Sequence, residues 1–387
     1  MYKEILISTT SSITQIAIIE NSVLIKIIVE RNDNVSLVGN IYEGQITRIL
    51  PGMKAAFVNI GLKKPAFLQN NSSIYHQGQI LLVQVIKEPA GNKQACLTTN
   101  ISIPSRYIIL LPNSSDLLKI SNRITSPKER QRLKKIFLSR SCKYSLIIRT
   151  AAEGVSENIL FNDLEFLYNL WQDIQDTRTS SLIYEELPIY LQVIRDLIDP
   201  MTYKFKVDSN AISEEISNFI KRFAPHFIPQ IEYFSTKKHT LFEQHSININ
   251  KFLEPKVMLN SGGYIIIEAT EAMTTIDVNT GSYIGKCNLS ETLFKTNLEA
   301  AITIANQIKL RNISGIIIID FIDMKNYVHK NKILDALKQG LINDHVKISE
   351  ISRLGLVEIT RKRTYDSLEQ VLCKTCPTCE GRGLVMK

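Results

Sequence analysis

Long hydrophobic runs are missing from this 387-residue sequence, and its amino end has no basic, apolar leader. No uncharged stretch approaches the ~18–20 residues that a helix needs to span a bilayer. The first residues, Met1-Tyr2-Lys3-Glu4, lack the pattern of a signal peptide. We therefore expect a cytoplasmic protein without a membrane span.

Cysteine is also scarce: there are six, of which Cys96, Cys142 and Cys287 stand alone in the sequence. Secreted domains that depend on disulfides carry paired cysteines, so this usage favours a reducing compartment. Hydrophobic residues make up 44% and charged residues 22%, as in ordinary globular proteins. A chain of this length is expected to form two to three domains, each with its own core.

Acidic residues are fewer than basic ones, 38 against 46, and the formal net charge is +8. A basic protein favours a polyanionic partner, which can be a nucleic acid or a membrane surface. Charge alone does not separate these two partners, so the motifs must decide.

The remaining cysteines lie together near the end of the sequence. Cys376 and Cys379 are separated by two residues, one of them Pro377, which is the spacing of a zinc knuckle. Structural zinc takes four ligands, and no second pair lies upstream, so two chains related by a two-fold axis can share one Zn²⁺. This predicts a zinc-linked homodimer. The alternatives are a reduced cysteine cluster and a self-contained site that also uses Cys373.

Hydrophobic patterns divide the chain into regions with different expected secondary structure. The first 150 residues carry short β-rich runs, and the last 130 or so alternate strands with helices, which indicates an α/β layer. The expected strands are 4–8, 13–20, 22–30, 106–111, 146–150, 263–269, 274–278, 315–320 and 356–360, and the expected helices are 127–139, 290–310 and 326–342. Residues 157–198 read as a helical section that Pro188 interrupts.

Residues 35–99 consist of short strands separated by glycines, which is typical of a small barrel. Phe57 and Phe67 flank a turn and can lie on neighbouring strands of one barrel face. In OB-folds, exposed aromatic rings stack on the bases of a single strand while nearby cations follow its backbone. Lys54 and Lys64 are such cations. The alternative is that both rings belong to the core.

Two segments of the second half carry acidic residues at strand ends. Asp277 and Asn279 are two residues apart and would share one face of a strand. Asp320 ends a strand of buried type, and the carboxyl ends of such strands gather ligand sites, so the three side chains could meet. Two carboxylates and an amide oxygen suit Mg²⁺, which can activate water for attack on a phosphodiester. The alternative is that the acids are helix caps.

Taken together, the motifs closely resemble the catalytic region of the ribonuclease E/G family, most nearly its ribonuclease G branch. They are VGNIYEGQITRILPGMKAAFVNIG at 38–61, IPSRY at 103–107, RTA at 149–151, SGGYIIIEATEAMTTIDVNTG at 261–281, IIIIDFIDM at 316–324 and CPTC at 376–379. The likeness covers essentially the whole chain.

The resemblance implies a multidomain fold of α/β and β type. Its parts would be an RNase H-like layer with an inserted OB-fold barrel and 5′-sensor, then a DNase I-like α/β layer and a zinc link. The corresponding ranges are 1–34 and 201–275 for the RNase H-like layer, 35–100 for the OB-fold, 101–200 for the 5′-sensor region, 276–370 for the DNase I-like catalytic domain and 371–387 for the zinc link.

The resemblance also implies an activity: Mg²⁺-dependent cutting of single-stranded, A/U-rich RNA that leaves 5′-phosphate ends, in ribosomal RNA processing and messenger RNA decay. Mg²⁺ would be held by Asp277 and Asp320 with Asn279 as hydrogen-bonding companion, and Zn²⁺ by Cys376 and Cys379. The family's base-stacking positions fall on Phe57 and Phe67, and its sensor for a 5′-monophosphate falls on Arg149, Thr150, Ile109 and Lys347.

One difference from the family concerns assembly. Family members continue past the zinc link into a small domain that joins dimers into tetramers, whereas this sequence stops at Lys387. We therefore expect a dimer. Two rival functions remain at this stage: a catalytically silent RNA-binding protein, and a metal-dependent nuclease acting on DNA.

Overall fold

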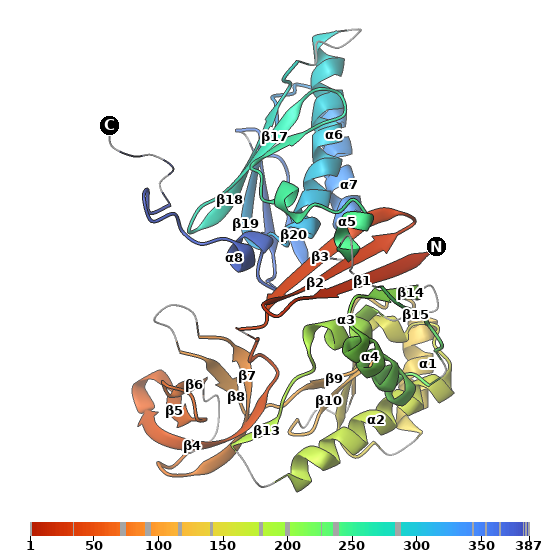
Figure 1. Cartoon of the computed structure of the whole chain (residues 1–387), viewed down its shortest axis with the longest axis vertical. Coiled ribbons are helices and arrows are strands. Elements are labelled where there is room, and N and C mark those ends of the chain that lie inside the picture. Colours follow the sequence, from red (N-terminus) through yellow and green to blue (C-terminus); the bar gives the residue numbers. More distant parts are fainter. Residues whose placement is uncertain are drawn as a thin grey trace. The chain divides into compact units, whose positions relative to one another are not determined.

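The computed structural model of the chain is shown in Figure 1. It describes residues 2–33, 35–69, 75–89, 94–114, 118–139, 142–177, 181–197, 202–225, 227–234, 240–282, 288–342, 344–352, 354–363, 365–381, 383 and 385. None of the helices in these ranges combines the length and apolar character needed to cross a bilayer.

The chain divides into two compact units. The first consists of Met1–Asp33, Tyr203–Asn210 and Gln230–Lys387, and the second of Asn34–Thr202 and Ala211–Pro229. The second unit is therefore inserted into the first. The finer division into six parts stays a prediction.

The first unit opens with a five-stranded sheet in the order β15-β14-β1-β2-β3. Its strands are β1 (Lys3–Thr9), β2 (Ile13–Glu20), β3 (Val23–Arg31), β14 (Thr202–Val207) and β15 (Gln230–Tyr233), followed by the short helix α5 (Leu241–Gln244). Asn21 and Ser22 join β2 to β3 with φ values of 49° and 67°. Positive φ at both central residues suits the right-handed twist of a two-residue hairpin.

A six-stranded sheet forms the rest of the first unit, in the order β16-β17-β18-β19-β21-β20. Its strands are β16 (Lys256–Met258), β17 (Tyr264–Ala269), β18 (Met273–Asn279), β19 (Gly315–Asp320), β20 (Val346–Ile348) and β21 (Leu356–Arg361), and its helices are α6 (Leu289–Leu310), α7 (Tyr327–Gly340) and α8 (Leu368–Leu372). Only β18 and β19 run parallel among these pairs, because α6 provides the crossover between them.

Helices α6 and α7 cover one face of this sheet (Figure 1). Ile276, Ile317 and Ile319 point into the core there, with Ile304 of α6 and Leu337 of α7. The side chains that alternate with these isoleucines along β18 and β19 therefore lie on the opposite face of the sheet. The buried stripe of α6 follows the 3.6-residue period of a helix and leaves Ile302, which is 52% exposed, outside it. The buried members are Ala300, Ala301, Ile304, Ala305 and Ile308.

The second unit contains a closed barrel of five strands, consistent with an OB-fold and with the predicted barrel. Its strands are β4 (Ile41–Leu50), β5 (Ala55–Asn59), β6 (Ala66–Gln69), β8 (Cys96–Thr98) and β7 (Ile80–Lys87), which pairs back to β4. A further strand, β13 (Leu182–Tyr184), pairs with β4 in antiparallel orientation and adds to this sheet. Residues 157–198 were predicted to be helical, and this prediction was wrong at β13. A three-residue strand has almost no pattern of its own, and pairing with β4 decides its conformation.

The remainder of the second unit is a small sheet with helices around it. The sheet has the order β11-β12-β10-β9. Its strands are β9 (Ile103–Pro104), β10 (Ile108–Leu111), β11 (Leu118–Ile120) and β12 (Ser145–Ile148), and the helices are α1 (Pro127–Leu138), α2 (Glu157–Asp176), α3 (Ile189–Leu197) and α4 (Asn210–Phe223). The single tryptophan, Trp171, is 4% exposed and packs in the core with Phe137 and Leu164, so its indole is a core group.

Gly44 provides a test of barrel packing. A Cβ at this position would lie 2.5 Å from Cγ1 of Val58 and 3.0 Å from Cγ2 of Ile60. We expect Gly44→Ala to lower the free energy of unfolding by about 1–3 kcal/mol through overpacking. Gly52→Ala is the matched control, because no atom lies within 4 Å of its Cβ. Denaturant unfolding of both variants is the measurement, and equal stability of the two would contradict the proposed close packing.

Candidate active site

The two aspartates singled out in the sequence are direct neighbours in the structure. Asp277 on β18 and Asp320 at the end of β19 are paired in the parallel register of these strands. Adjacent strands lie ~4.8 Å apart, so the two side chains stand next to each other. Both residues are exposed, and each alternates with buried neighbours such as Ile276 and Ile319, so both lie on the open face. The predicted meeting of these residues is confirmed.

Asn279 joins the pair from the same strand. Its Nδ2 donates a hydrogen bond of 2.7 Å to Oδ2 of Asp277. The bond fixes the orientation of one carboxylate. This geometry agrees with the companion role that the resemblance implied for Asn279.

A buried asparagine holds the chain just beyond Asp320. Asn297 of α6 is 0% exposed, and its side chain clamps the main chain of Ile322. Its Nδ2 donates to the Ile322 carbonyl at 2.7 Å, and its Oδ1 accepts from the Ile322 amide at 3.1 Å. Beyond the end of β19, the Asn297 side chain thus makes the hydrogen bonds that a neighbouring strand would otherwise make. These bonds fix the segment that carries Asp320 and Asp323. No motif in the sequence pointed to Asn297.

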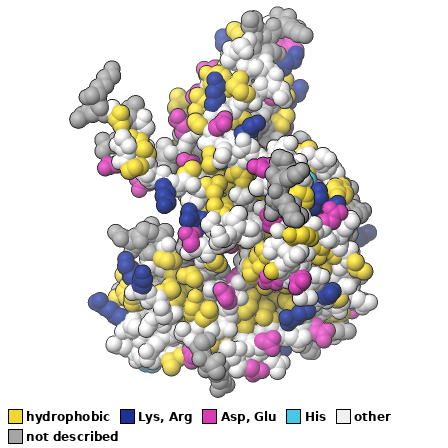
Figure 2. Space-filling model, in the orientation of Figure 1, with side chains coloured by type: hydrophobic (Ala, Val, Ile, Leu, Met, Phe, Trp, Pro, Cys, Tyr) yellow, Lys and Arg dark blue, Asp and Glu magenta, His cyan; other side chains and the backbone are white. Residues whose placement is uncertain are grey.

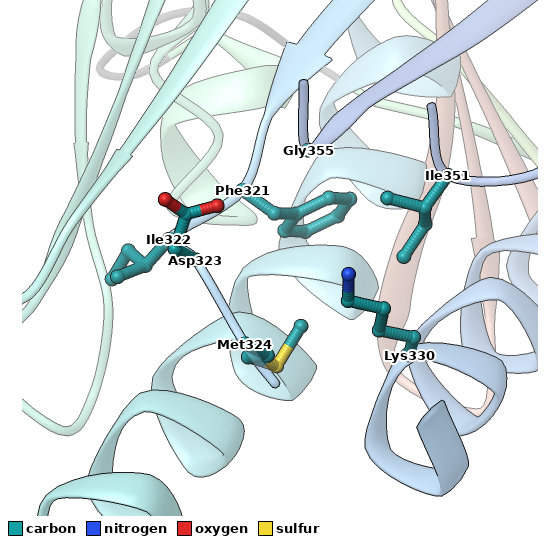
Figure 3. Close-up of a pocket in the computed structure, with 7 residues that line it drawn as sticks. All are labelled: Phe321, Ile322, Asp323, Met324, Lys330, Ile351 and Gly355. Atoms are coloured by element: carbon teal, nitrogen blue, oxygen red, sulfur yellow. The ribbon is translucent and has the colours of Figure 1, made fainter. Parts of the chain in front are cut away.

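Figure 3 shows the segment that follows Asp320. The ring of Phe321 points towards Ile351, and the ammonium of Lys330 approaches the space between them, while the Asp323 carboxylate lies on the other side of the chain. The cavity here has a volume of about 10 Å³. That is room for roughly one water, so substrate chemistry belongs to the open face rather than to this cavity.

The open face around the pair carries further carboxylates together with lysines, of which Lys347 is paired with Thr360 on β21. Glu268 on β17 and Glu358 on β21 are exposed and lie on the same face as the aspartates. Tyr264 is paired with Asn279, and Lys256 places its Nζ 4.0 Å from the centre of the Tyr264 ring. Adjacent carboxylates repel each other, so this face favours a cation.

The donor set fits magnesium. Mg²⁺ is bound through one or two carboxylates together with water and substrate phosphates, rather than in an all-protein cage. Asp277 and Asp320 supply two such carboxylates, with Asn279 fixing the first. No group of three or more His, Cys, Asp or Glu side chains is placed to hold a metal ion in the described part of the chain.

Phe57 and Phe67 lie in a row across the outside of the barrel. They are paired on β5 and β6, and their ring centres are 6.2 Å apart in an edge-to-face arrangement. Arg48 continues the row on β4, opposite Phe57. Both rings are half-buried and outside the barrel core, so the core alternative was wrong. Lys54 and Lys64 are exposed, and Figure 2 shows Lys and Arg side chains grouped over the barrel.

Three of the four predicted sensor residues come together in the second unit. Arg149 follows β12, and its main-chain amide bonds the Tyr107 carbonyl at 2.8 Å. Ile109 on β10 lies two positions after Tyr107, on the same face of the sheet. Thr150 Oγ1 lies 3.0 Å from Ser121 Oγ. Lys347 lies on β20, in the first unit, so its place in the sensor stays a prediction.

A buried aspartate supports the turn beneath Arg149. Asp163 of α2 is 3% exposed and accepts hydrogen bonds from Ser105 Oγ and, at 3.1 Å, from the Tyr107 amide. Burial raises the pKa of Asp163 to about 6. The carbonyl of Ser105 in turn accepts from Arg149. A lone aspartate inside an amphipathic helix gives no sequence signal for this role.

The cysteine pair lies in a tight turn after α8. The Glu380 amide donates to the Cys376 carbonyl at 2.9 Å, and Glu380 and Gly381 have φ values of 51° and 86°. Hydrogen bonds from the main chain at Cys379 and Thr378 hold the pKa of the Cys376 thiol below its usual range. A thiolate-favouring turn fits zinc. The described cysteines form no disulfide.

Asn297 offers a test of the segment beyond Asp320. Asn297→Ala would leave the amide and carbonyl of Ile322 without partners, at a cost of about 1–3 kcal/mol for each buried group. Displacement of Asp320 should lower cleavage of single-stranded RNA by about 10- to 100-fold. Asn306→Ala is the control, because Asn306 is an exposed asparagine of the same helix. Unchanged cleavage in Asn297→Ala would show that the clamp does not position the site.

Comparisons with known proteins agree with this geometry. The sequence model of the Ribonuclease E/G family matches residues 102–364. Ribonuclease G of Escherichia coli (strain K12) is 43% identical over 417 aligned residues, covering 100% of this chain and 85% of the relative. Ribonuclease G of Haemophilus influenzae is 42% identical, covering 99% and 84%, and ribonuclease E of Nostoc sp. is 37% identical, covering 89% and 54%.

The family match includes Arg149 and the paired aspartates, and the alignments with the ribonuclease G relatives extend over essentially the whole chain. The expected resemblance is therefore confirmed. The chain belongs to the Ribonuclease E/G family, and it is accordingly an endoribonuclease, a hydrolase of phosphodiester bonds in RNA.

Proposed function

We propose that this endoribonuclease is Mg²⁺-dependent, cuts single-stranded, A/U-rich RNA and leaves 5′-phosphate products. One observation carries the proposal: Asp277 and Asp320 are paired at the carboxyl ends of two parallel strands on an open face. The switch from β18 through α6 to β19 places both acids where α/β sheets bind their ligands.

The chemistry follows from what each side chain can do there. When bound, Mg²⁺ supplies a water of lowered pKa and neutralises charge that develops on the phosphate. Asp277 and Asp320 hold the ion, and the Asn279 amide keeps the Asp277 carboxylate in one orientation. Asn297 fixes the segment after β19, so that Asp320 does not move when substrate binds.

The barrel supplies sequence-tolerant binding of the RNA strand. Bases stack on Phe57 and Phe67, and each stacked base contributes about 1–3 kcal/mol. Arg48 lies beside Phe57 in the same row, and Lys54 and Lys64 are exposed on the barrel surface, where they can follow the phosphates. Stacking requires unpaired bases, which supports the preference for single strands.

Arg149, Thr150 and Ile109 form the proposed sensor for a 5′-monophosphate. A guanidinium and a hydroxyl are both donors that suit a terminal phosphate. A sensor of this kind favours RNA that has already been cut once, because cutting leaves a 5′-phosphate. This supports roles in ribosomal RNA processing and messenger RNA decay. Lys347 would contribute a further charge.

The Cys376–Cys379 turn would share a Zn²⁺ with a second copy of the chain and link a homodimer. The lowered pKa of the Cys376 thiol supports metal binding, and two thiolates leave two of the four zinc positions for the partner. Thiolates survive in a reducing compartment, which supports a cytoplasmic location.

A silent RNA-binding protein would need the barrel but not the carboxylate pair. The register of β18 with β19 and the Asn279 hydrogen bond favour catalysis over silent binding. A metal nuclease acting on DNA would not use a 5′-sensor for processed RNA, and the family match concerns ribonucleases.

The carboxylate pair is tested by neutral variants of equal shape. Asp277→Asn and Asp320→Asn should each lower cleavage of a 5′-monophosphorylated oligoribonucleotide by at least about a hundredfold, because charge stabilisation at the phosphate is worth several kcal/mol. Asp335→Asn is the control, since Asp335 is an exposed carboxylate of α7. Wild-type cleavage should stop in chelator. Binding without cleavage by the wild type in Mg²⁺ would select the silent binder.

The zinc link is tested by sedimentation and zinc analysis. Cys376→Ser with Cys379→Ser should convert dimers into monomers and remove bound zinc, since a serine hydroxyl does not replace a thiolate. Cys373→Ser should leave the dimer and the bound zinc unchanged. Loss of zinc in Cys373→Ser would select the self-contained site, and a dimer that persists in the double variant would refute the shared zinc.

A further inference from the structure

Within the part of the chain that the structure describes, the guanidinium of Arg149 is held from one side. Its Nη1 donates to the Ser105 carbonyl at 2.6 Å and to Oδ1 of Asp196 at 2.7 Å. A terminal nitrogen of arginine carries two hydrogens, so these two acceptors use both. Among the described residues, no acceptor is bonded to Nε or Nη2 of Arg149. The Nε–Nη2 edge is therefore the part of the group that is open to a ligand.

Asp196, at the end of α3, is itself fixed by two other arginines. The Arg106 guanidinium donates to the main-chain carbonyl of Asp196. Arg195 places its Nη2 3.7 Å from Oδ2 of Asp196, and it also binds Glu186 at 2.7 Å. Arg195 is buried, so this part of the cluster is rigid. Asp196 is thus an anchored acceptor rather than a mobile surface carboxylate.

The acceptor on the other side is anchored as well. Ser105 lies in the turn that Asp163 holds through the Ser105 hydroxyl and the Tyr107 amide. Arg149 therefore stands between two fixed acceptors, one main-chain and one charged. Arg149 and Arg195 both face the Asp196 carboxylate, and Arg195 also binds the Glu186 carboxylate, so Asp196 is held by two cations.

We propose that Asp196 is a positioning residue for the 5′-end sensor. By holding Nη1 together with the Ser105 carbonyl, it presents the Nε–Nη2 edge of Arg149 as a ready two-donor site for a terminal phosphate. Such paired donors match phosphate oxygens, and a side chain ordered in advance loses less entropy on binding. The inference rests on the proposed sensor role of Arg149.

The opposite role would be competition, in which the Asp196 carboxylate occupies Arg149 and the phosphate must displace it. The two roles predict changes of opposite sign when Asp196 is removed. Positioning predicts weaker binding of a 5′-monophosphate, and competition predicts tighter binding. The open Nε–Nη2 edge favours positioning, because a phosphate can bind there without displacing Asp196.

The test is binding of one oligoribonucleotide with a 5′-monophosphate or a 5′-hydroxyl, followed by fluorescence anisotropy. All proteins carry Asp277→Asn, so that the RNA stays intact. Asp196→Ala should weaken binding of the monophosphate form by about tenfold, a change of about 1.4 kcal/mol, and leave the hydroxyl form within about twofold. The affinity of Asp196→Asn for the monophosphate form should lie between those of wild-type Asp196 and Asp196→Ala, because the uncharged amide oxygen can still accept a hydrogen bond from Nη1. Glu165→Ala, an exposed carboxylate of α2, should change neither.

A second comparison separates positioning from general damage. Asp196→Ala added to Arg149→Gln should have no further effect, because the residue acts only through Arg149. Equal losses for both RNA ends, or a further loss in the double variant, would overturn the proposal, as would unchanged or tighter binding of the monophosphate. If Asp196→Ala does not fold, Asp196→Asn decides by the same criteria.

The failure of the underlying sensor has a different signature. A wild-type background that binds both ends equally, or an Arg149→Gln variant that keeps the preference for the monophosphate, would refute the sensor itself. A preference that Arg149→Gln abolishes and Asp196→Ala leaves intact would refute only the role of Asp196.

Discussion

The pairing of two like charges at the end of β18 and β19 is the constraint on which the active site depends. Asp277 and Asp320 face each other in register on adjacent strands. In water this arrangement is unfavourable, because neighbouring carboxylates repel each other. The fold nevertheless enforces it, since Ile276 and Ile319 beside them are buried under α6 and α7. The free energy of core packing thus maintains a local charge arrangement that a bound cation would relieve.

Strand β19 is held by polar side chains at both ends, so its register is well defined. At its start, the buried guanidinium of Arg361 donates to the Ile313 carbonyl at 2.8 Å and to the Asp344 carboxylate at 2.7 Å. At its end, Asn297 clamps Ile322. A slip by one residue would turn Asp320 into the core. Buried polar groups that are fully hydrogen-bonded specify one arrangement, which apolar packing alone does less strictly.

The same principle appears around Arg149 in the second unit. A buried carboxylate, Asp163, supports a turn, and the turn supports the guanidinium. Asp196 completes the arrangement through a charged contact. In both units, then, the residues that would meet RNA are exposed or half-exposed, and residues on neighbouring helices fix their positions. The outside of the barrel differs, because Phe57 and Phe67 are held by strand pairing itself.

Elements with local signals could be predicted from the order of the amino acids alone. The run Gly315–Asp320 forms β19 as predicted, because four consecutive isoleucines favour a buried strand. The pairing of Phe57 with Phe67 and the meeting of Asp277 with Asp320 also followed from alternation and strand ends. Only the tertiary structure revealed β13, Asn297 and Asp196. Each depends on a partner that is distant in the sequence, and no local pattern points to that partner. Strand β13 depends on β4, Asn297 on Ile322, and Asp196 on Arg149.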